Sequence, residues 1–327
     1  MSDVELVALA RGGDEAAYGE LAGAYRKELG AHCYRMLGSL HDAEDALQQS
    51  LLGAWQEMGG YDGSTSVRSW LYRISTDTCL RLSSQRPKKV LTSDQVAARQ
   101  DPGELGAPIL EPIWLEPCPD DPEAGYEQRV TVELAFIAAL QQIPSTQRAV
   151  LILREVLEYS AAEAAVILET SPQSVDNAFQ QARKAVDERI PPVSQQAELA
   201  SLGQDREQQL IDNFATAWEQ ADADSIGDLL ADDARYTMPP LPAWFDGRSA
   251  VMRFVTERLF ETRWRVRKIR ANGQPAFACY SYDPGDHLFR LGAINVLQLR
   301  DGKITWISAF LDPAVHHRFA VPETLPS

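Results

Sequence analysis

The spacing of apolar residues changes along this chain of 327 residues, and that change most constrains its fold. Between residues 42 and 56, apolar or small residues recur every three or four positions, which predicts an amphipathic helix. Between residues 277 and 312, the segments alternate as antiparallel strands do, and Asp301 with Gly302 has the composition of a hairpin turn. The sequence therefore predicts all-α domains followed by an α+β domain.

Charge and composition mark the boundaries between these parts. The net charge is −16, and residues 91–125 alone carry 1 basic and 8 acidic residues. That segment is also rich in proline and glycine, so we expect an irregular acidic connector. A second break begins with two prolines at residue 191. The predicted order is a helical domain (1–90), the connector (91–125), a second helical domain (126–190), a linker (191–204) and a C-terminal domain (205–327).

Several protein classes are excluded by the composition. The chain has no apolar run approaching the roughly 18 residues of a membrane span, and its first residues lack the pattern of a signal peptide. We therefore expect a soluble cytoplasmic protein. The cysteines are widely separated and lack CxxC or Cys/His metal spacing, so we expect reduced, mostly buried thiols and no metal site. They are Cys33, Cys79, Cys118 and Cys279.

Residues 143–186 carry the cap signals of a helix-turn-helix. Ser160 with Glu163 forms the pattern of a capping box, and Ser171 is followed by a proline at the first helical position. The last helix has Asp176 near its start and no base before Arg183. Lysine and arginine contacts to phosphates supply much of the affinity for DNA, so this domain should bind free DNA poorly.

Residues 32–56 and 66–75 resemble the second conserved region of the extracytoplasmic-function sigma factors of bacterial RNA polymerase. The resemblance implies that the helix with the sequence DAED binds the polymerase clamp and that the next helix reads the −10 side of the promoter. The implied polymerase-binding residues are Asp45, Gln48 and Trp55. The implied DNA-binding residues are Trp70, Arg73, Asp77 and Arg81. A role in the core remains an alternative for both tryptophans.

The helix-turn-helix resembles the fourth region of the same family, which reads the −35 side of the promoter. Glu169 stands where the family has a turn glycine. The implied DNA-binding residues are Gln173, Ser174, Asn177 and Gln181. The resemblance implies core RNA polymerase and promoter DNA as partners, and no cofactor.

The C-terminal domain, with a helix pair followed by alternating strands, resembles the SnoaL-like members of the NTF2-like superfamily. Residues 114–120 of the connector and residues 238–248, 270–277 and 309–313 resemble a group of sigma factors that carry such a tail. The resemblance implies a cone formed by a curved antiparallel sheet and helices, with an apolar pocket for a small-molecule ligand. The candidate pocket walls are Met238, Trp244, Trp264 and Phe310. The candidate acid–base residues, should the pocket be catalytic, are Asp312, Asp246, Tyr236 and Arg290.

Two hypotheses follow for the whole chain. In the first, the protein is a sigma factor that directs RNA polymerase to promoters and is regulated by its SnoaL-like tail. In the second, the sigma half is a scaffold that has lost promoter binding, and the pocket is a cyclase or isomerase of a biosynthetic pathway. No nucleophile–base pair is visible in the tail, and a fold by itself does not establish catalysis.

Overall fold

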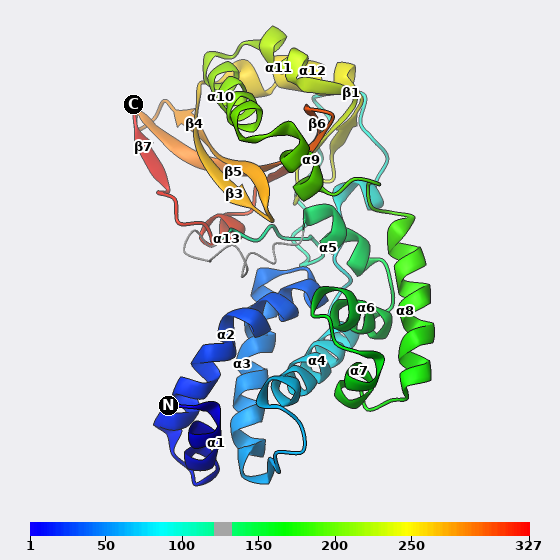
Figure 1. Ribbon diagram of the computed structural model, residues 1–327. Helices are drawn as coiled ribbons and strands as arrows, with labels where there is room; N and C mark the ends of the chain where they lie inside the picture. Colours follow the sequence, from blue (N-terminus) through cyan, green and yellow to red (C-terminus); the bar gives the residue numbers. More distant parts are fainter. Residues whose placement is uncertain (121–132) are drawn as a thin grey trace. The chain divides into compact units, whose positions relative to one another are not determined.

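A computed structural model describes residues 1–120 and 133–327 (Figure 1). The chain forms two compact units. The first unit combines residues 1–89 with residues 135–190, and the second combines residues 90–134 with residues 191–327. No helix in the described ranges is both long and apolar enough to cross a membrane.

The first unit is helical. Its first part contains α1 (Asp3–Arg11), α2 (Glu15–Leu37), α3 (Leu40–Glu57), a 3-10 turn (Met58–Gly60) and α4 (Val67–Gln85). Helices α2, α3 and α4 pack against one another (Figure 1). Gly38 ends α2 with φ of 69°, and Ser39 then caps α3. The predicted helix over residues 42–56 is confirmed, and the helix expected to follow it is α4.

The second part of this unit contains the predicted helix-turn-helix. Its elements are α5 (Leu134–Gln141), α6 (Ser145–Leu151), a π-helical turn (Ile152–Val156), α7 (Ala161–Ile167) and α8 (Pro172–Asp187). Both predicted caps are confirmed: Ser160 and Glu163 form a capping box, and Ser171 caps α8.

A buried arginine joins the two parts of the first unit. Arg148 of α6 donates hydrogen bonds to the carbonyl oxygens of Leu140 (2.7 Å) and of Met36 at the end of α2. Burial lowers the pKa of Arg148 to about 10. Gln141 adds a hydrogen bond from its side chain to the carbonyl oxygen of Arg35 (3.3 Å). The two helical regions therefore share one packed interior in this structure.

The second unit contains a seven-stranded sheet in the order β2-β1-β6-β5-β4-β3, with β7 paired to β5. The strands are β1 (Leu230–Thr237), β2 (Trp244–Asp246), β3 (Trp264–Ala271), β4 (Gln274–Asp283), β5 (Leu288–Arg300), β6 (Lys303–Phe310) and β7 (Thr324–Pro326). The helices are α9 (Gln195–Leu202), α10 (Gln204–Gln220), α11 (Ala223–Leu229), α12 (Arg248–Glu257) and α13 (Pro313–His316), with a 3-10 turn at Leu259–Glu261.

The α+β prediction for the tail is confirmed, with one difference in the sheet. The β1–β6 pair is parallel, whereas the other pairs are antiparallel, so the curved sheet is mixed (Figure 1). The predicted hairpin turn connects β5 to β6, and Asp301 and Gly302 have φ of 53° and 70°. Aromatic and aliphatic side chains from α10, α12 and one face of the sheet form the core, including Phe214, Trp218 and Phe254.

The connector and the linker are ordered parts of the second unit where the structure describes them. The indole N–H of Trp244 donates to the carbonyl oxygen of Val96 (2.8 Å). The backbone N–H of Asn272 donates to the carbonyl oxygen of Cys118 (2.9 Å). In the linker, Gln195 begins α9 and exchanges two hydrogen bonds with the backbone of Leu299. The predicted boundary at residues 125 and 126 lies outside the described residues.

Candidate functional site

One exposed face of α3 carries two of the three candidate polymerase-binding residues. Gln48 is exposed and Trp55 is partly exposed. Leu52, which was not among the predicted residues, lies between them on the same face and is 58% exposed. The sequence did carry a signal for Leu52, because it is an apolar residue on the mainly polar face of the predicted helix. These three residues, Gln48, Leu52 and Trp55, define what we call the α3 face.

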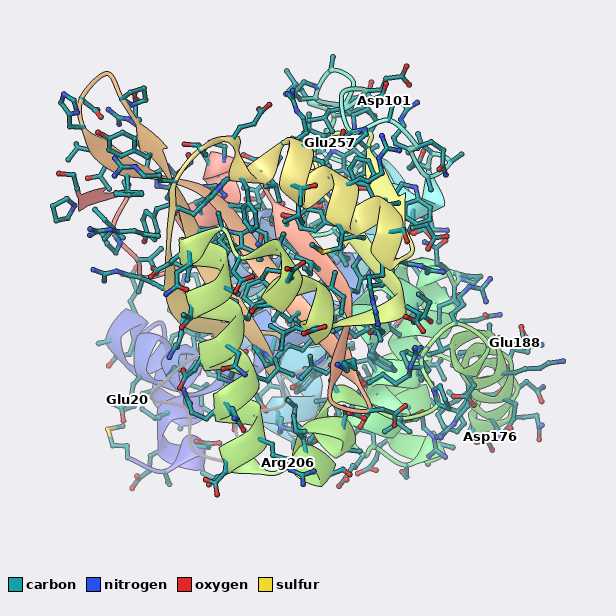
Figure 2. All side chains as sticks on the ribbon, turned by 90° about the horizontal axis from the view of Figure 1, so that it is seen from above. Glu20, Asp101, Asp176, Glu188, Arg206 and Glu257 are labelled. Atoms are coloured by element: carbon teal, nitrogen blue, oxygen red, sulfur yellow. The ribbon has the colours of Figure 1, made fainter. Side chains whose placement is uncertain are left out.

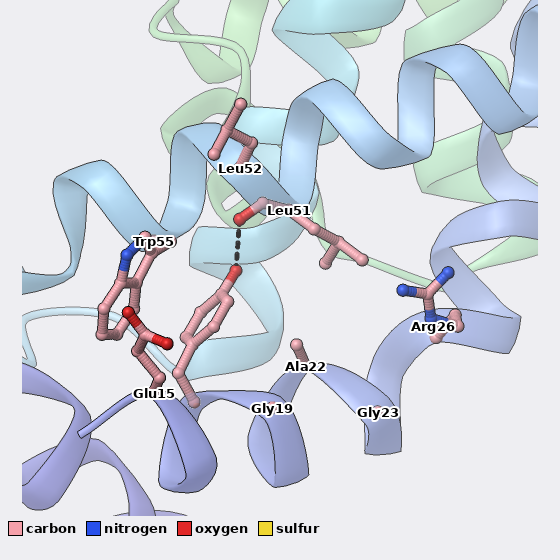
Figure 3. A pocket seen from close by; sticks show the side chains of 9 residues that line it. Glu15, Gly19, Ala22, Gly23, Arg26, Leu51, Leu52 and Trp55 are labelled. Atoms are coloured by element: carbon pink, nitrogen blue, oxygen red, sulfur yellow. Dashed lines mark hydrogen bonds between the residues drawn. The ribbon is translucent and has the colours of Figure 1, made fainter.

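The α3 face borders a groove between α2 and α3 (Figure 3). The groove has a volume of about 380 Å³. Its wall includes the ring of Trp55, which lies 5.0 Å from the ring of Tyr18. The Tyr18 hydroxyl donates to the carbonyl oxygen of Leu51, and burial raises the pKa of Tyr18 to about 12. The floor is mainly apolar, while Glu15 and Arg26 add opposite charges.

The third candidate, Asp45, belongs to a network of ion pairs. Its carboxylate lies 2.8 Å from Arg86, which also pairs with the buried Asp42. Lys89 lies 3.0 Å from Asp42 on the other side. The network fixes the start of α3 against the segment after α4. Asp45 keeps 35% of its side chain exposed, so a partner can still reach it.

Three of the four candidate DNA-binding residues of α4 form a stripe on its surface, in which Arg73 is partly exposed and the other two are exposed. Arg73, Asp77 and Arg81 are spaced by four residues, which places them on one side of the helix. Trp70 is only 7% exposed, and its ring packs 5.0 Å from that of Tyr61. Trp70 therefore lies in the core in this structure, outside the stripe, and its role in DNA binding stays a prediction.

Both basic residues of this stripe already have partners. Arg73 lies 2.8 Å from the Glu57 carboxylate and 3.6 Å from that of Glu169, the residue at the glycine position of the helix-turn-helix. Arg81 donates to the side-chain oxygen of Gln49 (2.8 Å). The second and fourth regions thus meet at a residue that would otherwise be available to DNA.

The candidate DNA-binding residues of α8 are all exposed: Gln173, Ser174, Asn177 and Gln181. Ser174 helps to cap the helix, because its amide donates to Ser171 Oγ (3.2 Å). Gln181 accepts a hydrogen bond from the side chain of Gln147 (2.9 Å). The structure brings all four onto one helix, as predicted, but the positions carry no positive charge.

The charges around α8 largely cancel. Asp176 lies at the surface (Figure 2) and 3.8 Å from Arg154. Arg183 lies 3.1 Å from Glu155 and 3.6 Å from Asp187. Because these arginines are paired with carboxylates, fewer free cations remain to neutralise DNA phosphates.

The four candidate acid–base residues of the tail do not form a cluster. Asp246 pairs with Arg235 at the surface (3.2 Å), and Asp312 caps α13 through the amide of Ala314 (2.9 Å). Arg290 pairs with Asp283 in the β4–β5 hairpin. Tyr236 is buried in the core, where burial and the Cys279 thiol raise its pKa. The arrangement supplies no acid–base pair.

The four candidate pocket residues lie on two opposite faces of the sheet. Met238 and Trp264 contact the core between the sheet and the helices. Trp244 and Phe310 occupy register positions of the opposite face, and the Trp244 indole contacts the connector. These four side chains therefore do not line a single pocket, because strand alternation separates them. Asn295, which was not among the predicted residues, is fully buried on the face of β5 that points toward the core.

Comparisons with known protein families agree with the three parts of the chain. The Sigma-70 region 2 family matches residues 21–86, and the Sigma-70 region 4 family matches residues 133–186. The SnoaL-like domain family matches residues 211–307.

Individual relatives extend these matches over nearly the whole chain. The ECF RNA polymerase sigma factor SigG of Mycobacterium tuberculosis is 37% identical over 326 residues, covering 96% of this chain and 86% of the relative. SigW of Bacillus subtilis, another ECF RNA polymerase sigma factor, is 25% identical and covers 54% of this chain and 91% of its own. The crystal structure of the Mycobacterium tuberculosis factor SigJ has a TM-score of 0.61 at 19% identity, covering 93% of this chain and 99% of the other.

Proposed function

This chain belongs to the ECF RNA polymerase sigma factors, and from this premise we propose that it directs core RNA polymerase to promoters in the cytoplasm under the control of its SnoaL-like tail. The observation that best supports the proposal is the pair of exposed surfaces on adjacent helices. The α3 face presents Gln48, Leu52 and Trp55, and the α4 stripe presents the side chains that would contact DNA.

Core polymerase would bind the α3 face. Leu52 and Trp55 offer apolar area beside the groove, while Gln48 offers hydrogen bonds. A buried apolar anchor with a polar rim is the arrangement that gives most protein interfaces their affinity. Asp45 would contribute from the edge of this face, where it is held by Arg86.

Promoter DNA would contact the α4 stripe and the start of α8. The α8 residues can hydrogen bond to base edges or phosphates, but they supply little electrostatic affinity. We therefore expect promoter recognition to require core polymerase, which would add its own contacts with DNA. In this arrangement, binding to promoter would also separate Arg73 from Glu169, since a phosphate and the carboxylate compete for the same guanidinium.

The alternative hypothesis, a repurposed scaffold with a catalytic tail, is less well supported. It needs acid–base groups that converge on a substrate, whereas Asp246, Asp312 and Arg290 each have a separate partner at the surface. We do not propose a reaction for the tail.

Transcription with purified components tests the proposal. The full chain and core RNA polymerase are incubated with a library of promoter fragments, and the transcripts are sequenced. We expect transcripts that start at a shared sequence and depend on the protein. A change in their amount when residues 191–327 are removed would support regulation by the tail. If the folded full chain binds core polymerase but selects no sequence, promoter recognition has been lost.

A further inference from the structure

Strand β3 of the tail concentrates positive charge within an acidic protein. Its eight residues include four basic residues and no acidic residue, and Arg263 directly precedes it, although the whole chain has a net charge of −16. The strand lies at one end of the sheet order, where β4 is its neighbouring strand, and only its last residue, Ala271, also bridges to Pro119 of the connector. This positive charge therefore lies at an edge of the domain.

The basic residues divide between the two faces of the strand. Lys268 pairs with Asp212 of α10, and Arg270 lies 2.7 Å from Glu207 of the same helix. The charges on this face are therefore compensated inside the domain.

The other face carries Arg263, Arg265 and Arg267, which we call the arginine row. Alternate residues of a strand point to the same side, so the three share one face. All three are exposed, and none of them forms an ion pair with a carboxylate of the described residues. The acids of the neighbouring β4–β5 hairpin, Asp283 and Asp286, instead pair with Arg290. Uncompensated charge thus remains on the row.

Aromatic rings hold two members of the row in place. The guanidinium carbon of Arg263 lies 3.9 Å from the centroid of the Tyr282 ring, and that of Arg265 lies 4.9 Å from the centroid of Phe289. Arg265 also donates to the carbonyl oxygen of Pro326 (3.0 Å). A guanidinium stacked on a ring stays charged and loses less freedom when it binds an anion.

We propose that the arginine row binds the phosphate backbone of DNA, which gives the tail a direct contact with the nucleic acid. Alternate residues of an antiparallel strand repeat at about 6.8 Å. One DNA strand advances about 3.4 Å along the axis per phosphate, and its phosphates are farther apart along their helical path. The repeat of the row is thus of the size needed to meet neighbouring phosphates, and the planar guanidinium matches a phosphate with two parallel hydrogen bonds.

DNA is the polyanion that these observations favour. The inference rests on the proposed sigma-factor function, in which the protein operates on DNA. In the helix-turn-helix, the bases Arg154 and Arg183 are paired with carboxylates. The arginine row instead presents three arginines without a carboxylate partner among the described residues. Its contacts would be to phosphates and would therefore be independent of base sequence.

Fluorescence anisotropy of the full chain on a duplex of random sequence, without polymerase, tests the inference. Binding is measured from about 50 to 200 mM salt, the range over which several phosphate contacts give a large loss of affinity. The test variant replaces the three arginines of the row with glutamine. The control variant changes Arg206, Arg258 and Arg300 to glutamine, which alters the net charge equally on other elements of the tail (Arg206 is labelled in Figure 2). A third variant replaces the row with lysines.

We expect the glutamine variant of the row to lose at least tenfold in affinity at low salt. The slope of log K against log salt should fall by up to about 2.7, because each phosphate contact contributes about 0.9. The control should change little, and the lysine variant should keep most of the slope, since it keeps the charge. Equal losses in the row and control variants would overturn the proposal, as would an unmodified protein that does not bind the duplex.

Two further outcomes separate this inference from others. If the glutamine variant binds DNA normally but binds core polymerase more weakly, the row contacts a protein and the proposal is wrong. Promoter-selective transcription by the unmodified protein is measured in parallel. If the unmodified protein shows no promoter-selective transcription but binds DNA through the row, only the proposed sigma-factor function is refuted. If it transcribes normally and the row variants bind DNA as the unmodified protein does, only the inference is refuted.

Discussion

His32 couples the stability of the first unit to pH through its burial. The ring is fully buried, and its Nε2 lies 2.9 Å from Thr76 Oγ1. Burial, with a smaller effect of Arg35, lowers its pKa from 6.5 to about 3. The unfolded chain takes up a proton near pH 6.5, whereas the folded protein does so only near pH 3. The contribution of neutral His32 is therefore complete above pH 6.5 and is lost as the pH falls through this window.

Replacing His32 with glutamine should remove this pH dependence. Between pH 7.5 and pH 5, the free energy of unfolding of the unmodified protein should fall by roughly 2 kcal/mol more than that of His32→Gln, at about 1.4 kcal/mol per pH unit below pH 6.5. Urea denaturation followed by circular dichroism at the two pH values measures the difference. His41→Gln, at an exposed histidine, is the control and should behave like the unmodified protein. Parallel losses in all three proteins would contradict the assignment to His32.

Substitution of Leu52 tests directly whether the α3 face binds core polymerase. Leu52→Glu should weaken binding to core polymerase at least tenfold, about 1.4 kcal/mol, because it places a charge in the apolar part of the α3 face. The melting temperature should stay within a few degrees, since the side chain is already 58% exposed. Val193→Glu, at another exposed apolar residue, is the matched control. Retention of Leu52→Glu on immobilised core polymerase at the unmodified level would rule out this face.

Single residues differ in how far sequence could predict their environment. The amphipathic pattern of α3 predicted its buried side correctly, because that pattern is local. It could not distinguish Trp55 from Trp70: a tryptophan fits either a core or an interface, and only tertiary packing leaves the first partly exposed and buries the second. The same holds for Tyr236, whose strand was predicted but whose packing in the core was not.

At the scale of secondary-structure elements, the turn between α7 and α8 combines two features of one residue. Glu169 has φ of 50°, the left-handed region that glycine adopts without strain. Its carboxylate also lies 3.6 Å from Arg73 of α4. The first feature costs conformational energy, and the second is an exposed ion pair that contributes no more than about 1 kcal/mol.

Two substitutions separate these features. Glu169→Gln removes the charge and keeps the backbone strain, whereas Glu169→Gly removes both. We expect the glycine variant to be more stable than the glutamine variant by about 1 kcal/mol, because the strain is relieved. Thermal and urea unfolding measure this difference. Equal stability of the two variants would show that the turn is not strained by the side chain.

Helix starts and the β5–β6 turn were predictable, because their signals lie within a few residues. Ser160 with Glu163, Ser171 before a proline, and Asp301 before Gly302 all have the expected geometry. The parallel β1–β6 pair was not predictable. It joins strands separated by some seventy residues, and neither strand alone carries a signal for the direction of its neighbour.

At the scale of the whole molecule, the composition of the connector predicted its irregular structure but not its hydrogen-bond partners. Its charge and its prolines correctly indicated that it would form little regular structure. They carried no information on its partners, since the hydrogen bonds join residues about 150 positions apart, such as Cys118 with Asn272 and Val96 with Trp244. Within the second unit, the described part of the connector therefore depends on the tail for its order.

Protease sensitivity of the connector tests this dependence. Arg99 is the single trypsin site in residues 91–120, and its backbone amide donates to the carbonyl oxygen of Trp244 (2.8 Å). Trypsin binds its substrate in an extended conformation, so the segment around Arg99 must detach from the domain before it is cleaved. Cleavage after Arg99 should therefore be slow in the full chain. It should become at least tenfold faster in the chain that ends at Ile190, and several-fold faster in the full chain with Trp244→Ala, which keeps the tail but loses the indole bond to Val96. Cleavage after the exposed Arg11 of the other unit supplies the internal reference, and mass spectrometry follows both products over time. If the ratio of the cleavage rates after Arg99 and after Arg11 is the same in all three proteins, the tail does not order the connector in solution. Regulation by the tail could then not act through the connector.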